Sequence, residues 1–180
     1  MQQNNRLGAS IRRLTLAAML TAISVVIGIF CKNFLNFGTG LFRITFENLP
    51  IILAGILFGP VTGGLVGGAS DLISYLLSSQ IYPPNLIVTA GAVAVGVVSG
   101  FVSRFIYKNR GDRQVILSGT LAHIVGSMII KPIGLYQFYG ILVLWRIPLY
   151  LLIAPIEIFL ICQIFRRDSL RRLFGSIKEK

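Results

Sequence analysis

Residues 43–77, RITFENLPIILAGILFGPVTGGLVGGASDLISYLL, decide the fold class of this chain. They contain two apolar segments joined by a tight corner at Gly59-Pro60, with Glu47 and Asp71 embedded in otherwise lipid-compatible sequence. A charged residue such as Asp at the centre of a membrane helix costs about 2.5–3.5 kcal/mol on insertion scales, and such groups usually face a bundle interior or a cavity. The stretch therefore indicates a membrane protein that binds something, rather than one that only anchors.

The whole chain is too apolar for a soluble domain of its length. Of its 180 residues, 54% are hydrophobic and 13% are charged. A membrane-spanning helix needs about 20 predominantly apolar residues. We therefore predict one domain, residues 1–180: an all-α polytopic membrane protein with six transmembrane helices in a compact bundle. The predicted spans are 14–31, 46–59, 61–78, 86–106, 114–131 and 145–165, of which the second and third are short and glycine-rich.

The net charge of +11 raises the alternative of nucleic-acid binding, but the placement of the cations follows membrane topology. If six spans alternate, thirteen cations fall on one side: Arg6, Arg12, Arg13, Arg104, Lys108, Arg110, Arg113, Arg166, Arg167, Arg171, Arg172, Lys178 and Lys180. Four remain on the other side: Lys32, Arg43, Lys131 and Arg146. Because cytoplasmic loops carry the excess of Lys and Arg, we expect a multi-pass protein of the cell membrane with both termini in the cytoplasm and no nucleic-acid partner.

The first span follows Arg12 and Arg13, as the apolar region of a signal peptide would. Its apolar run is too long for that, and no small-residue cleavage site followed by a soluble domain is present. We interpret it as a retained helix.

Small residues recur at four-residue spacing in several spans, which lets helix backbones approach closely. In the third, fourth and fifth spans this pattern predicts packing inside the bundle. In the first span, Ala18 and Ala22 fit a partner helix as well as an internal neighbour, and the residues alone leave both readings open.

Asp71 is the leading candidate for a ligand acceptor. It follows Gly64, Gly67 and Gly68 by seven, four and three residues, so it shares their close-packed helix face. We therefore expect its carboxylate to face protein, not lipid.

The predicted outer half collects cations, ring faces and hydrogen-bonding groups around this acceptor. Arg suits an anionic ligand because its planar fork pairs with a carboxylate in two bonds, and an acceptor beside an aromatic ring suits a flat heterocycle with N–H donors. Together these groups predict an amphoteric ligand. The candidate substrate-binding residues are Asp71, Tyr75, Arg43, Lys131, Gln137, Tyr139, Trp145, Arg146, His123 and Asn85.

Each group also has a structural interpretation. Arg43 can pair with Glu47 one turn away, and Arg146 can extend to the lipid interface. Tyr and Trp side chains are common as interfacial anchors, and a single helix histidine such as His123 is more often packed than ligand-binding. Glu157 can bond a neighbouring helix.

The sequence carries no motif for chemistry of its own. It contains no phosphate-cradling nucleotide motif, one histidine, and neither H-E-x-x-H nor C-x-x-C. Because a protein-built zinc site needs several His or Cys ligands, we predict no metal, no cofactor, no catalytic residues and no enzymatic activity.

Two stretches resemble a known family. The basic N-terminus leading into LAAMLTAISVV, and FENLPIILAGILFGPVTGGLVGGASDLISYLL, are similar to the first three helices of the substrate-binding S components of energy-coupling-factor (ECF) vitamin transporters. Within that family the chain looks most like the folate-specific S component, through FRITFENLP, the Asp71 segment and KPIGLYQFYG.

The resemblance implies a function and partners. It implies capture of folate outside the cell, and uptake driven by a transmembrane coupling protein and two cytoplasmic ATPases, with Ala18 and Ala22 facing the coupling protein. The alternatives are an S component for another vitamin, such as pantothenate or a pyridoxine-like compound, and a structural membrane subunit that binds no ligand.

Overall fold

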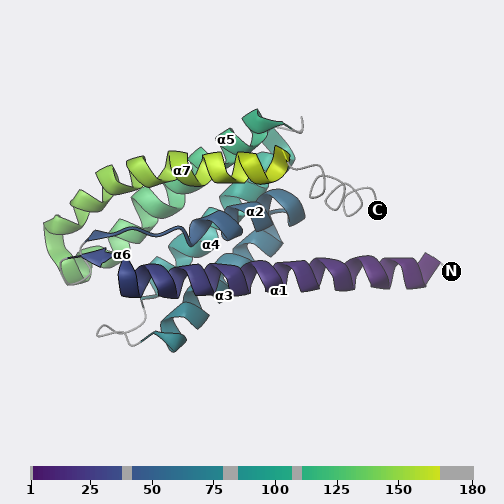
Figure 1. Ribbon diagram of the computed structural model, residues 1–180, viewed down its shortest axis with the longest axis horizontal. Coiled ribbons are helices and arrows are strands. Elements are labelled where there is room, and N and C mark those ends of the chain that lie inside the picture. Colours follow the sequence, from purple (N-terminus) through teal and green to yellow (C-terminus); the bar gives the residue numbers. More distant parts are fainter. Residues whose placement is uncertain (1, 38–41, 79–84, 107–110, 167–180) are drawn as a thin grey trace.

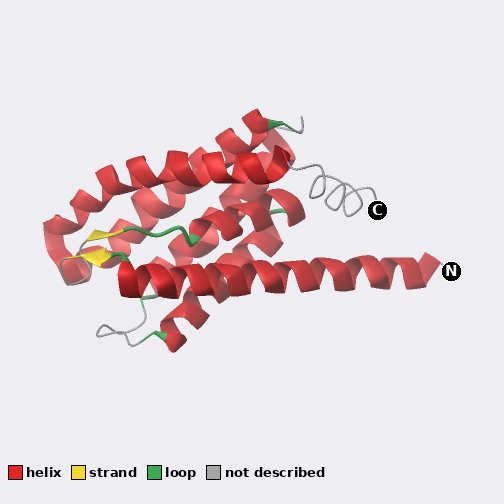
Figure 2. Cartoon of the chain, in the orientation of Figure 1, coloured by secondary structure: helices red, strands yellow, loops and turns green. Residues whose placement is uncertain are grey.

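The computed structural model describes residues 2–37, 42–78, 85–106 and 111–166. This part of the chain is almost entirely helical, apart from one short antiparallel strand pair and brief connections (Figure 2). The elements in chain order are α1 (Gln2–Phe34), β1 (Asn36–Phe37), β2 (Phe42–Arg43), α2 (Asn48–Phe58), α3 (Pro60–Leu77), α4 (Leu86–Phe101), η1 (Val102–Ile106), α5 (Asp112–Ala122), η2 (His123–Ile130), α6 (Lys131–Tyr139), η3 (Gly140–Trp145) and α7 (Arg146–Arg166).

The helices lie side by side in one bundle (Figure 1). α1 begins and α7 ends at the same end of the bundle, and the N-terminal part of α1 extends beyond the other helices. The β1–β2 pair lies at the opposite end, near the corner where α6 leads through η3 into α7. Apolar side chains of α2, such as Ile51, Ile52 and Ala54, are fully buried at the centre.

The predicted all-α membrane architecture is confirmed at the level of helix type and apolarity. Within the described residues, three helical segments are long and apolar enough to cross a membrane: Ser10–Phe34, Leu86–Ile106 and Asp112–Arg166. This is fewer than the six predicted spans. Asn48–Phe58 is apolar but short, and the last two predicted spans fall within a single helical run of 55 residues.

The stretch 131–146, which connects the fifth and sixth predicted spans, is helical rather than a loop. It forms α6 and η3, so Asp112–Arg166 is helical throughout. The sequence KPIGLYQFYG did not predict a helix, because it is polar and aromatic and because Gly134 and Pro132 are weak helix formers. Pro132 lies in the first turn of α6, where a missing N–H costs little. The connection between the third and fourth predicted spans, 79–85, falls largely outside the described residues.

The α2–α3 corner and the α3–α4 contact follow from glycine. Gly59 has φ +96°, a conformation that side chains with a Cβ rarely adopt, and Pro60 then starts α3. Along α3, a Cβ on Gly67 would stand 2.2 Å from the carbonyl oxygen of Ala92 on α4. The predicted close packing of these spans is therefore confirmed, with backbone against backbone.

Gly67 and Gly68 test this contact as a matched pair. In Gly67→Ala the new methyl meets backbone that cannot rotate away, so we expect destabilisation of about 1–3 kcal/mol or more. In Gly68→Ala it meets only Val93 Cγ2, at 3.1 Å, and the better helix propensity of Ala offsets this contact. Thermal unfolding of the purified variants in detergent measures both. Equal midpoints for the two variants would contradict the proposed packing.

Candidate functional site

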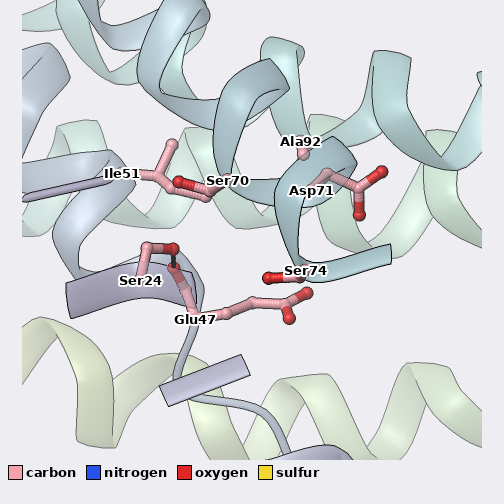
Figure 3. Close-up of a pocket in the computed structure, with 7 residues that line it drawn as sticks. All are labelled: Ser24, Glu47, Ile51, Ser70, Asp71, Ser74 and Ala92. Carbon is pink, nitrogen blue, oxygen red and sulfur yellow. Dashed lines mark hydrogen bonds between the residues drawn. The ribbon is translucent and has the colours of Figure 1, made fainter. Parts of the chain in front are cut away.

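A small hollow lies where α1, α2, α3 and α4 meet the segment before α2. We call this space the polar hollow. The residues that line it are Ser24, Glu47, Ile51, Ser70, Asp71, Ser74 and Ala92. In Figure 3 the Glu47 side chain reaches below Ser74, while the Asp71 carboxylate points away from Ser70. Asp71 is half-buried and Glu47 is buried, so Asp71 is the more exposed of the two acids. The enclosed space is about what a single water molecule occupies.

Asp71 is half-buried and faces protein, as its position on the glycine face predicts. Its Oδ2 accepts a hydrogen bond of 2.7 Å from the Thr89 hydroxyl on α4. Tyr75, one turn further along α3, is also half-buried. The glycine-lined approach of α4 to α3 thus brings Thr89 to the carboxylate.

The segment before α2 is held against α1 by a buried serine and a glycine. Ser24 Oγ donates to the Glu47 carbonyl at 2.7 Å, the dashed line in Figure 3. One turn further along α1, a Cβ on Gly28 would stand 3.1 Å from Glu47 Oε2 and 3.2 Å from Ser74 Oγ. The absent side chain at Gly28 therefore leaves space for the carboxylate.

Glu47 forms a buried ion pair with Lys131, at the start of α6. Lys131 Nζ lies 3.2 Å from Glu47 Oε1 and 3.1 Å from Asn48 Oδ1. Asn48 Nδ2 in turn donates to Ser127 Oγ at 3.3 Å. Lys131 is 3% exposed and Glu47 9%, so this network ties α2 to η2 and α6 away from water.

The lysine reaches Glu47 past α4 because residue 91 is glycine. A Cβ on Gly91 would lie 2.7 Å from Lys131 Cγ. The preceding η2 segment is a π-helix, a rare form that occurs frequently at functional sites. Lys131 was predicted to bind the ligand, but in the structure its ammonium group pairs with Glu47.

His123 pairs with Glu157 inside the bundle. Its Nε2 lies 2.8 Å from Glu157 Oε2, with side chains 1% and 0% exposed. The contact is close, but it lacks the alignment of a regular hydrogen bond. This pair joins η2 to α7. His123 is therefore packed inside the bundle, and Glu157 contacts a neighbouring helix, as the structural interpretations of these two residues expected.

Arg146 and Tyr139 form a second feature, at the corner between α6 and α7. The Arg146 guanidinium carbon lies 5.5 Å from the centre of the Tyr139 ring, within cation–π range. Arg146 is 6% exposed, so it is buried and does not extend to the lipid interface. Nearby in sequence, Trp145 and Gln137 are exposed, and Trp145 has the exposure of an interfacial anchor.

Asn85 and Arg43 complete the predicted set. Asn85 is the N-cap of α4: its side chain accepts from the Ile87 N–H at 2.9 Å and donates to the Gly134 carbonyl on α6. Arg43 lies in β2, and its side chain is outside what the structure describes. Ala18 and Ala22 are exposed on α1, together with Val26 one turn further along.

Sequence reasoning missed part of the polar hollow. Ser24, Ser70 and Ser74 were not predicted, and Glu47 was assigned only to Arg43. A usable signal existed, since Ser70 and Ser74 are one helical turn apart beside Asp71, and Ser24 precedes Gly28 by one turn. Nothing in the local sequence links Glu47 to Lys131, because 84 residues separate them.

The comparisons with known proteins define the class. Residues 12–177 match the family model for the ECF transporter, substrate-specific component, and the chain belongs to this family. It is therefore a substrate-binding component of a membrane transporter.

Individual proteins that are similar to this chain include folate transporters. The chain is 27% identical to the folate transporter FolT of Clostridium novyi over 122 residues, 66% of this chain and 67% of that protein. A crystal structure of FolT bound with folic acid superimposes with a TM-score of 0.64 at 25% identity, over 83% of this chain and 89% of the other. The S component of a bacterial ECF transporter gives 0.63 at 25% identity, over 94% and 99%.

The Glu47–Lys131 pair predicts strong coupling between two mutations. Lys131→Met leaves a buried carboxylate without its lysine, and we expect a loss of about 3–5 kcal/mol. Adding Glu47→Gln removes that charge, so the double variant should be more stable than Lys131→Met alone. Thermal unfolding of Lys131→Met, Glu47→Gln and the double variant in detergent measures this coupling. Additive losses would show that the two side chains do not act together.

Proposed function

We propose that this chain captures folate outside the cell as the S component of an ECF transporter. The likeness to FolT, in sequence and over most of the fold, carries this proposal. Folic acid is amphoteric: a pterin ring with adjacent N–H donors at one end and a glutamate with two carboxylates at the other. The polar hollow offers acceptors for the first end, and the buried Arg146 corner offers a cation for the second.

The proposed topology has six membrane crossings in a single domain. Two arguments support it. A helical run of 55 residues is far longer than the roughly 20 residues of one span, and it folds back at η3 so that α7 packs on α5. α1 begins and α7 ends at one end of the bundle, as an even number of crossings requires. The elements at that end carry four cations, Arg12, Arg13, Arg104 and Arg166. Because positive charge collects on the cytoplasmic side, this placement favours cytoplasmic termini.

The proposed partners are a transmembrane coupling protein and two cytoplasmic ATPases, as membership of the family implies. The chain itself contains no nucleotide-binding motif, so ATP hydrolysis falls to these partners. Ala18 and Ala22 form a smooth exposed stripe on α1, where small side chains let another helix approach closely.

Folate binding tests the ligand directly. The purified chain should bind folate tightly without ATP. Because hydrogen bonds to charged groups contribute about 1.5–3 kcal/mol, Arg146→Ala should weaken binding about 10–100-fold. Arg113→Ala, an exposed arginine on α5, serves as the control. Titration calorimetry in detergent measures all three. Tight binding of pantothenate or a pyridoxine-like vitamin without folate binding would replace the ligand but keep the class.

The α1 stripe has its own test. Leucine at Ala18 and Ala22 should abolish co-purification with the coupling protein, because the bulky side chains prevent close approach. Folate affinity should be unchanged. Ala90→Leu on α4, also an exposed alanine, controls for added apolar bulk. Normal assembly of the Ala18→Leu/Ala22→Leu variant would exclude the stripe as the docking face.

A further inference from the structure

His123 and Glu157 are buried ionisable groups that lie outside the candidate ligand site. Within the described residues they are 1% and 0% exposed, and neither is among the residues that line the polar hollow. His123 begins η2 and Glu157 lies inside α7, so the pair joins two elements that are well separated in the sequence. Because both side chains are buried, water does not compensate a charge on either of them.

The two side chains meet through one close contact. His123 Nε2 lies 2.8 Å from Glu157 Oε2, a hydrogen-bond distance, and among the described residues neither side chain has another hydrogen-bond partner. A bare imidazole nitrogen and an ionised carboxylate oxygen both present lone pairs, and these would repel each other at such a distance. A hydrogen atom therefore lies between Nε2 and Oε2, on the ring or on the carboxyl group.

The charge of the pair depends on how many titratable protons it holds. With none, a neutral imidazole faces an ionised carboxylate, and one negative charge is buried. With two, an imidazolium faces a protonated carboxyl group, and one positive charge is buried. With one proton the pair has no net charge, either as imidazolium and carboxylate or as imidazole and carboxylic acid. Since an unpaired buried charge is strongly unfavourable, burial favours one proton.

The nearest other charges balance each other. Besides His123, Lys131 and Glu47 are the charged groups that act on Glu157, and these two pair with each other at 3.2 Å. α4 packs against η2, and α2 and η3 pack against α7. None of these three described elements carries an ionisable side chain.

The remaining charges lie at the ends of helices. Arg146 begins α7, and the eleven residues between it and Glu157 correspond to about 16 Å of helix. At the other end of α7, Arg166 pairs with Asp112. The other ionisable side chains on elements packed against η2 or α7 are Arg43, Arg113, Tyr136, Tyr139, Tyr150 and Cys162. The pair therefore reaches neutrality through its own proton.

We propose that His123 and Glu157 form a buried binding site for one proton, and that this proton joins η2 to α7. The two groups hold the proton as a unit, because strongly interacting groups titrate as a pair. The folded chain keeps this proton over the pH range in which an exposed histidine would lose it. The site does not depend on the identity of the transported ligand.

The protonation of His123 can be measured directly, because it is the only histidine of the chain. Labelling histidine with nitrogen-15 therefore gives the NMR signals of this ring alone. With one proton in the pair, Nε2 takes part in the hydrogen bond to Glu157 and Nδ1 carries a hydrogen. We expect the ring nitrogen shifts in detergent micelles to show a protonated Nδ1, unchanged from about pH 5 to 8.

Two NMR results would overturn the proposal. A bare Nδ1, with hydrogen on Nε2 only, would mean that a neutral ring lies beside an ionised Glu157. A transition of the ring signals near about pH 6.5 would mean that His123 exchanges its proton with solvent as an exposed histidine does. Both measurements use the wild-type chain, so they do not depend on the folding of any variant.

The pH dependence of unfolding gives a second test. In the unfolded chain, glutamate loses its proton near about pH 4.3 and histidine near about pH 6.5. Between these values the folded and unfolded chains both hold one proton, so the pair should add no pH dependence. Above about pH 6.5 only the folded chain keeps the proton, so the unfolding constant should rise up to tenfold per pH unit. Unfolding in mixed micelles with added sodium dodecyl sulfate measures this constant.

Two variants serve as comparison and baseline. In Glu157→Gln the lone imidazole stays neutral in the fold, so the unfolding constant should rise up to tenfold per pH unit as the pH falls below about 6.5. The double variant His123→Gln/Glu157→Gln has no titratable group at the site and gives the baseline of the remaining chain. A wild-type profile that follows Glu157→Gln would contradict the proposal. It would leave the proposed function standing, because neither residue lines the polar hollow.

Discussion

Burial of the Glu47 carboxylate is the constraint on which the rest of the site depends. A carboxylate in a low-dielectric interior requires a cation and hydrogen bonds around it. Lys131 supplies the cation at 3.2 Å, and Asn48 and Ser127 extend the network to η2. The glycines at 28 and 91 follow from the same requirement, since Cβ atoms there would crowd Glu47 Oε2 and the Lys131 stem. One buried charge thus fixes how α1, α2, α4 and α6 meet.

The two acids that are buried within the described residues have different consequences. Glu157 is fully enclosed with His123, between two helices, and is not among the residues that line the polar hollow. Glu47 lines that hollow while paired with a lysine. Glu47 therefore belongs to the candidate site as well as to the packing of the bundle, whereas Glu157 contacts the histidine of η2.

Much of the fold could be predicted from the sequence, because its determinants are local. The long apolar stretches predicted the helices, and Gly59-Pro60 predicted the α2–α3 corner. The small residues of α3 and α4 predicted the close contact between these helices. Resemblance of 43–77 to S components agrees with the family match over 12–177. The helical character of 131–146 was not predicted, because tertiary packing overrode weak local propensity there.

The candidate site was predicted less completely, because its contacts are not local. Asp71 faces protein as its helix face indicates, but the partner of Glu47 lies 84 residues away. The one-turn spacing of the serines beside Asp71 and Gly28 was a usable but weak signal, because serines are common where membrane helices pack. Lys131 and His123, read as ligand-facing groups, lie instead against Glu47 and Glu157.

A crystal structure of this chain with folate bound would test these relations most directly. We expect the folate ring to lie beside Asp71, with Lys131 still paired to Glu47 and the glutamate tail directed toward Arg146. A folate molecule bound elsewhere, with no ligand atom near Asp71, would contradict the role assigned to this part of the chain.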